Sequence, residues 1–143
     1  MKTFLAVIVI LVLCCFIHSA GAEDKSTDPC RDKNSNAETR ECYTKEQLRV
    51  NAEVDSLVRE IAAKYRKDAR GFDKESTVVS GAMRETAFMV MQSQRTWKIY
   101  RNQHCRAVML SLDIGSGAGT AHEQCMFELG QARLKELRTA FNE

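Results

Sequence analysis

Apolar residues recur at three- and four-residue steps along three segments of this chain. In the first segment the apolar positions are Val50, Val54, Leu57, Ile61 and Tyr65. Charged residues lie between them, so the spacing predicts an amphipathic helix with one face turned to a core. Ser35 or Asn36 is suited to cap its start, and Glu38 completes a capping box, so we expect the helix to begin at about residue 36.

Two further helices follow from the same kind of pattern. A second is predicted over residues 82–111, which are rich in helix formers and contain no glycine or proline. Its inner stripe consists of Met83, Ala87, Val90, Trp97, Tyr100, His104 and Val108. A third is predicted from about residue 121 to about residue 141, with its apolar side formed by Met126, Leu129, Leu134, Leu137 and Phe141.

The remaining segments connect or precede these helices. Residues 23–35 are polar and contain the only proline, Pro29. Residues 66–80 are charged and interrupted by Gly71, so we expect a loop with a short helical turn there. Period-2 strand patterns are absent. We therefore predict an all-α fold over residues 36–143, an up-down bundle of three main helices plus a short N-terminal helix.

The first 22 residues have the pattern of a cleaved leader. Lys2 gives a positive start, an apolar run follows, and residues 20–22 are small, as a cleavage site requires. The run is shorter than the roughly 20 residues that span a membrane. We expect a signal peptide over residues 1–22 and a mature protein that is periplasmic or secreted, without a membrane segment. Cys14 and Cys15 make a lipoprotein the competing interpretation, although the preceding Leu13 is larger than a lipobox residue.

Four cysteines remain after the leader: Cys30, Cys42, Cys105 and Cys125. An even number in an exported chain indicates a disulfide framework, and three pairings are possible. We favour Cys30–Cys42 and Cys105–Cys125, because each pair closes one turn between neighbouring segments. The second pair would then stabilise the fold by roughly 3 kcal/mol. Zinc binding is the alternative, but no Cys-x-x-Cys spacing occurs, so we expect no metal.

Charge and motif content exclude two classes of function. Without Lys2 the chain has 20 basic and 19 acidic residues, which is not the strongly basic balance of a nucleic-acid-binding protein. His104 and Cys105 are adjacent on a helix, where their side chains point about 100° apart, and no nucleophile elbow or paired carboxylates surround Ser116, His122 or Glu123. We expect neither an enzyme nor a cofactor.

The C-terminal half carries a family resemblance. It contains Gln94, Trp97, Tyr100, Arg101 and Cys105 on one helix, then the pair Gly115 and Ser116, then Cys125 and a terminal helix over residues 131–137. With Cys30, Cys42 and the intervening residues 37–41, this pattern resembles the LprI-type lysozyme inhibitor family over about residues 30–137. The chain departs from the family pattern at Val54, Asp55 and Val58, where a Leu-Asn pair and a tyrosine are usual. The resemblance implies an exported helical protein that inhibits lysozyme.

We expect structural roles for the signature residues on the second helix. Trp97 lies on the apolar stripe and is expected to pack in the core, and Gln94 is expected to be a hydrogen-bonded core amide. Arg101 can stack on Trp97 or pair with a carboxylate of the third helix, and we favour the ion pair.

The connection between the second and third helices is the candidate binding site. Nine residues, 112–120, are expected to lie outside the helices, more than the usual two to eight. Glycine is most useful where the backbone approaches a partner closely, and a disulfide at both ends would lower the cost of ordering the loop. The predicted partner-binding residues are Asp113, Gly115, Ser116, Gly117, Gly119, Thr120 and Glu123.

This loop and the resemblance together predict an exported lysozyme inhibitor. Lysozymes carry two carboxyl groups in a cleft. The loop over residues 113–123 would insert there and offer hydroxyl and backbone N–H donors to the carboxyl groups. Asp113 and Glu123 would meet the basic rim of c-type lysozymes and speed the encounter.

Other functions use the same features. A periplasmic immunity protein would bind a peptidoglycan hydrolase delivered by a rival bacterium. A small-ligand carrier would also be helical and exported, but the cysteine spacing does not fit the odorant-binding-like class. A structural envelope protein without inhibitor activity is the third alternative. The lysozyme type and the oligomeric state are not predicted.

Overall fold

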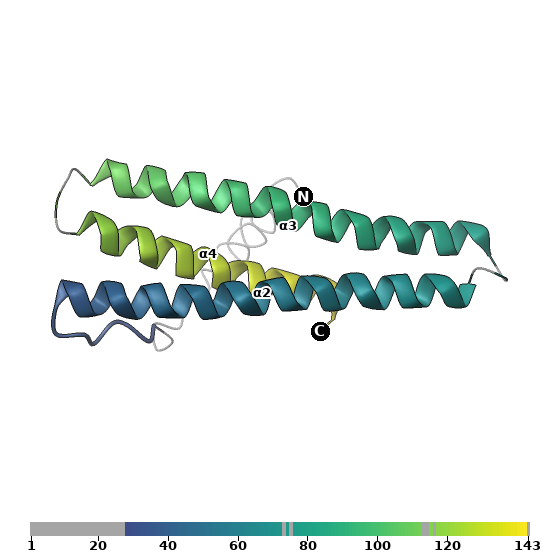
Figure 1. The fold of residues 1–143 in the computed structure, drawn as a ribbon, viewed down its shortest axis with the longest axis horizontal. Coiled ribbons are helices and arrows are strands. Elements are labelled where there is room, and N and C mark those ends of the chain that lie inside the picture. Colours follow the sequence, from purple (N-terminus) through teal and green to yellow (C-terminus); the bar gives the residue numbers. More distant parts are fainter. Residues whose placement is uncertain (1–27, 73, 75, 113–114, 116, 143) are drawn as a thin grey trace, which may run out of the picture.

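A computed structural model describes residues 28–72, 74, 76–112, 115 and 117–142. Three helices run up, down and up: α2 (Asn36–Phe72), α3 (Thr77–Ser111) and α4 (Ala118–Phe141), labelled as in Figure 1. No strand occurs among the described residues. The predicted all-α bundle of three main helices is confirmed. The expected leader, Asp113 and Ser116 lie outside the described residues.

The start of α2 matches the predicted capping box in part, because Ser35 caps the helix but Glu38 reaches the N–H of Asn34 and not that of Ser35. The Ser35 hydroxyl accepts the backbone N–H of Glu38 at 3.2 Å. In return the Glu38 carboxylate accepts the N–H of Asn34 at 3.1 Å. These two bonds satisfy donors that a helix start otherwise leaves without partners. The additional short N-terminal helix that we expected is not a separate element, because the chain from residue 36 continues directly into α2.

The predicted loop over residues 66–80 is largely wrong. The structure continues α2 to Phe72 and starts α3 at Thr77. The charged residues of this region that the structure describes are exposed, while Ala69 and Ser80 are buried between the helices. Gly71 falls in the last turn of α2, where it does not break a helix interior. Ser76 caps α3 by accepting the N–H of Val79 at 3.3 Å.

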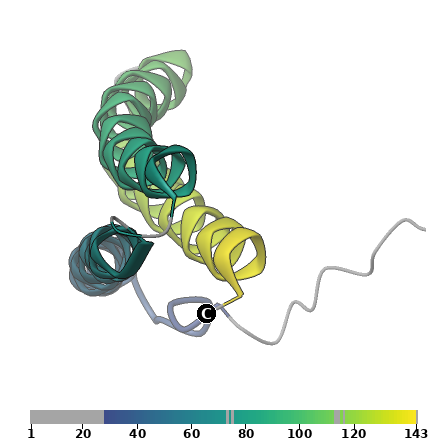
Figure 2. The same cartoon turned by 90° about the vertical axis from the view of Figure 1, so that its right-hand side faces the viewer.

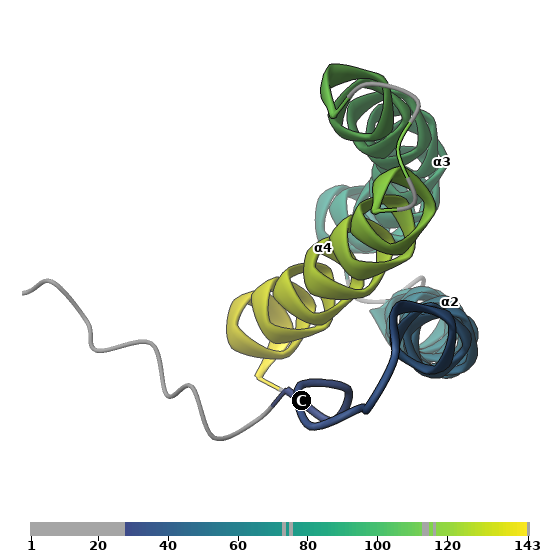
Figure 3. The ribbon, with the colours of Figure 1, turned by 90° about the vertical axis from the view of Figure 1, so that its left-hand side faces the viewer.

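The core lies along α2, where Val50, Val54 and Ile61 are fully buried, and its contacts from the other helices are Val90, Phe127, Leu134 and Leu137. Aromatic pairs close it at two levels: Tyr43 meets Phe127 with ring centroids 5.8 Å apart, and Tyr65 meets Phe141 at 6.1 Å. End-on views show α4 lying to one side of the α2–α3 pair (Figures 2 and 3).

Two residues of the predicted inner stripe of α3 face solvent instead. Tyr100 is 51% exposed, and His104 is exposed beside it with the rings stacked at 5.5 Å. Their neighbours Arg101 and Cys105 point inward. The reason is that Cys105 forms a disulfide with α4 and Arg101 has polar partners inside the bundle, which together fix the rotation of α3.

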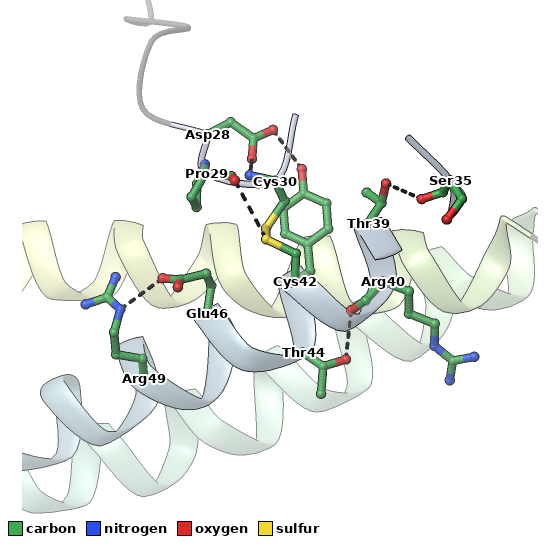
Figure 4. Close-up of a disulfide and its surroundings, with 11 residues drawn as sticks. Asp28, Pro29, Cys30, Ser35, Thr39, Arg40, Cys42, Thr44, Glu46 and Arg49 are labelled. Carbon is green, nitrogen blue, oxygen red and sulfur yellow. Dashed lines mark hydrogen bonds and ion pairs between the residues drawn. A yellow bond between two sulfur atoms is a disulfide. The ribbon is translucent and has the colours of Figure 1, made fainter. Parts of the chain in front are cut away.

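Both predicted disulfides are confirmed. Cys30–Cys42 ties the N-terminal segment to α2 (Figure 4), and Cys105–Cys125 joins α3 to α4, with Cα atoms 5.7 and 5.6 Å apart. Asp28 reinforces the first tie: its carboxylate accepts the N–H of Cys30 at 2.9 Å and the hydroxyl of Tyr43 at 2.7 Å. No helix in the described part of the chain is long and apolar enough to cross a membrane.

Candidate functional site

The connection between α3 and α4 is shorter than the sequence suggested. Helix α3 ends at Ser111 and α4 begins at Ala118, which leaves six residues, 112–117, instead of nine. The helix starts early because the N–H of Ala118 bonds to the carbonyl of Gly115 and that of Ala121 to the carbonyl of Gly117. Six residues is an ordinary length for such a connection. The length of this loop is therefore not evidence for a binding function.

Gly115 and Gly117 remain unusual for another reason. Both are exposed, and neither has a positive φ. An added Cβ at Gly117 would meet nothing within 4 Å, and at Gly115 only the carbonyl of Leu112 at 4.0 Å. Neither the backbone conformation nor packing against the residues that the structure describes requires glycine here. The loop surface at these two positions is therefore open to a partner.

Gly119 and Thr120 lie against the start of α2. The position of a Cβ at Gly119 is 2.9 Å from the guanidinium carbon of Arg40. The Thr120 hydroxyl bonds to the Asn36 side-chain oxygen at 2.5 Å. Thr120 therefore connects α4 to α2, and Gly119 allows the close approach of Arg40. Thr120 also lines a shallow pocket of about 610 Å³. Its lining consists of Asn36, Ala37, Arg40, Glu41, Thr44 and Thr120. Figure 4 shows Arg40 and Thr44 on the first turns of α2.

The α2 residues of this pocket were not predicted as site residues. Sequence reasoning confined the site to one connection, and nothing in the pattern of residues 36–44 indicates that they meet Thr120, 76 or more positions later. Only the up-down topology, which returns the α3–α4 connection to the start of α2, could have pointed to them.

Glu123 is directed inward more than expected. Its carboxylate lies 3.3 Å from Nδ1 of His122, and its side chain is 16% exposed. Cys105–Cys125 sits beside it and anchors both helices, with Cys105 fully buried. The disulfide and the Thr120–Asn36 contact thus fix the helices next to the loop. Only the short connection itself projects beyond these fixed positions.

The signature residues of α3 form a separate polar layer between the three helices. Trp97 is partly buried, and the guanidinium carbon of Arg101 lies 4.9 Å from its ring centroid. Arg133 of α4 lies 6.0 Å from the same centroid. Both arginines are only 7% exposed. Stacking on the indole face stabilises cations that are buried in this way.

Arg101 has no carboxylate partner from α4, which was the expected ion pair. It donates to the side-chain oxygen of Asn51 on α2 and lies over Trp97. Burial lowers the pKa of Arg101 below its ordinary value, and the negative charge of Asp55 on α2 acts in the opposite direction. The compensating charge therefore comes from α2, and the stacking alternative is the observed one.

Gln94 is the hydrogen-bonded core amide that we predicted. Its NH₂ group donates to Asp55 at 3.1 Å, and its oxygen accepts from Arg133 at 3.4 Å. Lys98 also forms an ion pair with Asp55, at 2.6 Å. Sequence reasoning missed Arg133. A signal was available, since Arg133 lies three residues after Gly130 and four before Leu137 on the buried side of α4.

The fold and the arrangement of these residues can be compared with those of known proteins. The fold is a helical bundle with two disulfides, a Trp–Arg layer between its helices and a glycine-containing tip, which is the class of a small disulfide-stabilised helical protein. The model of the family described as lysozyme inhibitor LprI matches residues 30–137. The chain belongs to this family. No curated protein and no solved structure matches it.

Proposed function

We propose that this protein inhibits a peptidoglycan-cleaving lysozyme by placing the loop over residues 113–123 in its substrate cleft. Membership of the lysozyme inhibitor family supports the class of partner. The observation that carries the choice of surface is the pair of exposed glycines, Gly115 and Gly117, which no contact with a described residue of the chain requires. Glycines of this kind allow another protein's backbone or side chains to approach the loop closely.

The chemistry of the tip suits the two carboxyl groups of a lysozyme cleft. Gly117 caps α4 without a side-chain hydrogen bond, and no acidic residue lies in the first turn of this helix. The partial positive charge of a helix N-terminus, together with its backbone N–H groups, favours anions. Ser116 would add a hydroxyl donor. Thr120 and Gly119 would hold the tip to α2, and Asp113 and Glu123 would serve the encounter with a basic rim.

The place of action is part of the same proposal. Two disulfides persist in oxidising compartments such as the periplasm or the cell exterior. The expected leader over residues 1–22 would direct the chain there. Lysozyme that reaches the cell wall would meet the inhibitor in that compartment.

The test is a titration of c-, g- and i-type lysozymes with the oxidised mature protein, with peptidoglycan hydrolysis as the readout. We expect stoichiometric loss of activity with one type. The variant Ser116→Ala/Gly117→Trp should abolish this inhibition. Gly71→Trp is the matched control, because a Cβ at Gly71 also meets nothing within 4 Å and the residue lies at the opposite end of the bundle. Equal inhibition by both variants would exclude the loop as the inhibitory surface.

A further inference from the structure

The end of the molecule opposite the loop is built from two helices. At 1.5 Å per residue, the 37 residues of α2 span about 56 Å and the 24 residues of α4 about 36 Å. Phe141, at the end of α4, lies against Tyr65. Beyond this contact α2 and α3 continue as a two-helix extension (Figure 1). A groove that the proposed lysozyme site does not use begins on this extension, at Arg66 and Arg70, and continues along α3 to Arg95.

The groove has a volume of about 730 Å³ and combines basic and apolar side chains. Its lining consists of Arg66, Arg70, Arg84, Ala87, Phe88, Met91 and Arg95. Four of these seven residues are arginines and none is acidic. Phe88 is 61% exposed, although a phenylalanine in a monomeric bundle normally gains from burial. Positive charge beside an exposed aromatic ring indicates a surface with its own ligand.

Helix geometry places the groove on the flank of α3 that faces away from α4. Ser93 and Gln94 accept hydrogen bonds from Arg133 of α4. At 100° per residue, Phe88 and Met91 lie about 120° and 60° from Gln94 on the side opposite to Ser93. Helix α4 therefore leaves this groove uncovered.

Three of the four arginines in the groove, Arg66, Arg70 and Arg95, have no acidic partner among the described residues, in contrast to arginines elsewhere on the bundle. Neither Arg66 nor Arg70 makes a hydrogen bond or ion pair with any residue that the structure describes. Arg95 donates to the uncharged side chain of Gln92 at 3.0 Å. By contrast, Arg49 and Arg138 both pair with Glu53. Arg84 has a partner within the chain, so three guanidinium groups are left to meet carboxylates from outside.

We propose that this groove binds an acidic peptide segment of a second protein partner, with an apolar side chain of that segment seated on Phe88 and Met91. Guanidinium groups bind carboxylates through two parallel N–H donors, which gives both strength and direction. The groove is concave between two helices, which suits a single chain segment better than a flat membrane surface. The basic rim of a c-type lysozyme would be repelled here, so the partner differs from that of the loop.

The experiment measures fluorescence anisotropy of a labelled peptide made of glutamates with a leucine at every third or fourth position. The full mature chain is titrated into it at low and physiological salt. Two further probes are the same peptide with glutamine in place of glutamate, and vesicles of equal parts phosphatidylglycerol and phosphatidylcholine. We expect binding of the acidic peptide, weakened by salt, and no binding of the glutamine peptide.

Arg66→Glu/Arg70→Glu should weaken peptide binding by about tenfold or more. The matched control is Arg106→Glu/Lys135→Glu, which makes the same change in net charge at two exposed positions outside the groove. Phe88→Ala should weaken binding several-fold without a change in charge. Equal effects of the two double variants, or binding to vesicles but not to the peptide, would overturn the proposal. Lysozyme inhibition by Arg66→Glu/Arg70→Glu should be unchanged, which separates this site from the loop.

Discussion

The guanidinium group of Arg101 lies over the ring of Trp97, one helical turn earlier on α3, with 4.9 Å between the guanidinium carbon and the ring centroid. Arg101 also donates to Asn51 of α2, and Arg133 of α4 approaches the same ring. All three helices are therefore joined at one tryptophan. The signature residues of the family have a structural role in this chain, which is why we propose binding at the α3–α4 loop and at the groove between α2 and α3 instead.

Replacing Arg101 with lysine should destabilise the fold. A lysine keeps the charge but loses the planar guanidinium that stacks on Trp97 while donating to Asn51. We expect Arg101→Lys to lower the free energy of unfolding by about 1–3 kcal/mol, measured by urea denaturation followed through tryptophan fluorescence. Arg106→Lys, at an exposed position on the same helix, should stay within about 0.5 kcal/mol of the parent protein. Equal stability of the two variants would contradict the role assigned to the Arg101–Trp97 contact.

Gly130 marks the closest approach of α4 to α2. A Cβ there would lie 2.9 Å from Cγ1 of the fully buried Val50, which cannot move aside. Overpacking costs about 1–3 kcal/mol, and the helix propensity gained with alanine offsets up to about 1 kcal/mol of it. We expect Gly130→Ala to be destabilising by up to about 2 kcal/mol in thermal or urea unfolding.

Gly81→Ala is the control for this prediction. Gly81 lies within α3, and a Cβ there meets nothing within 4 Å. The same substitution should therefore stabilise the protein by about 0.5–1 kcal/mol. Opposite signs for the two variants are expected, and a stabilising Gly130→Ala would show that the two helices can separate at no cost.

The sequence predicted the bundle well because its signals are local. Apolar spacing, the Ser35 capping box and the short loops between cysteines each depend on residues close together in the chain. The helix ends within residues 66–80 were missed because the charged residues and Gly71 suggest a loop. Ser76 capping and the buried Ala69 and Ser80 favour helix there, and both burials depend on the partner helix.

The candidate site was harder to predict for the same physical reason. Thr120 contacts Asn36 across 84 positions, and Arg133 reaches Gln94 across 39. The periodic spacing of apolar residues does not indicate which residues far apart in the sequence form such hydrogen bonds. Tyr100 was wrongly assigned to the buried stripe of α3 because an aromatic side chain is expected to be buried more often than an arginine. In the structure Arg101 is buried instead, because it has polar partners inside the bundle.

Removal of the Cys105–Cys125 disulfide should affect both stability and inhibition. Cys105→Ser/Cys125→Ser and Cys30→Ser/Cys42→Ser should each lower the free energy of unfolding by about 3 kcal/mol, because the two loops that they close are of similar length. Only the first pair anchors the helices on both sides of the proposed inhibitory loop. Lysozyme titration of both variants, under conditions where each is folded, should show weaker inhibition for Cys105→Ser/Cys125→Ser alone. Equal loss of inhibition would mean that the disulfide does not prepare the loop for binding.

Tyr43 should make stability depend on alkaline pH. Burial, followed by the hydrogen bond and negative charge of Asp28 and the charge of Glu128, raises the pKa of Tyr43 well above its ordinary value of about 10. Because the folded protein holds this proton when the unfolded chain has lost it, the stabilisation is complete below about pH 10 and declines as the pH rises further. At about pH 8, Tyr43→Phe should be less stable than the parent protein by about 1 kcal/mol, since it lacks the 2.7 Å bond to Asp28.

Urea unfolding of both proteins between about pH 8 and about pH 11 tests the sign of this dependence. The advantage of the parent protein over Tyr43→Phe should shrink as the pH rises through 10, because ionisation of Tyr43 favours only the unfolded chain of the parent. Tyr100→Phe controls for loss of a tyrosine hydroxyl, since Tyr100 is half exposed and lies outside the core. A stability difference between parent and Tyr43→Phe that stays constant or grows over this range would show that Tyr43 ionises in the folded protein as readily as in the unfolded chain.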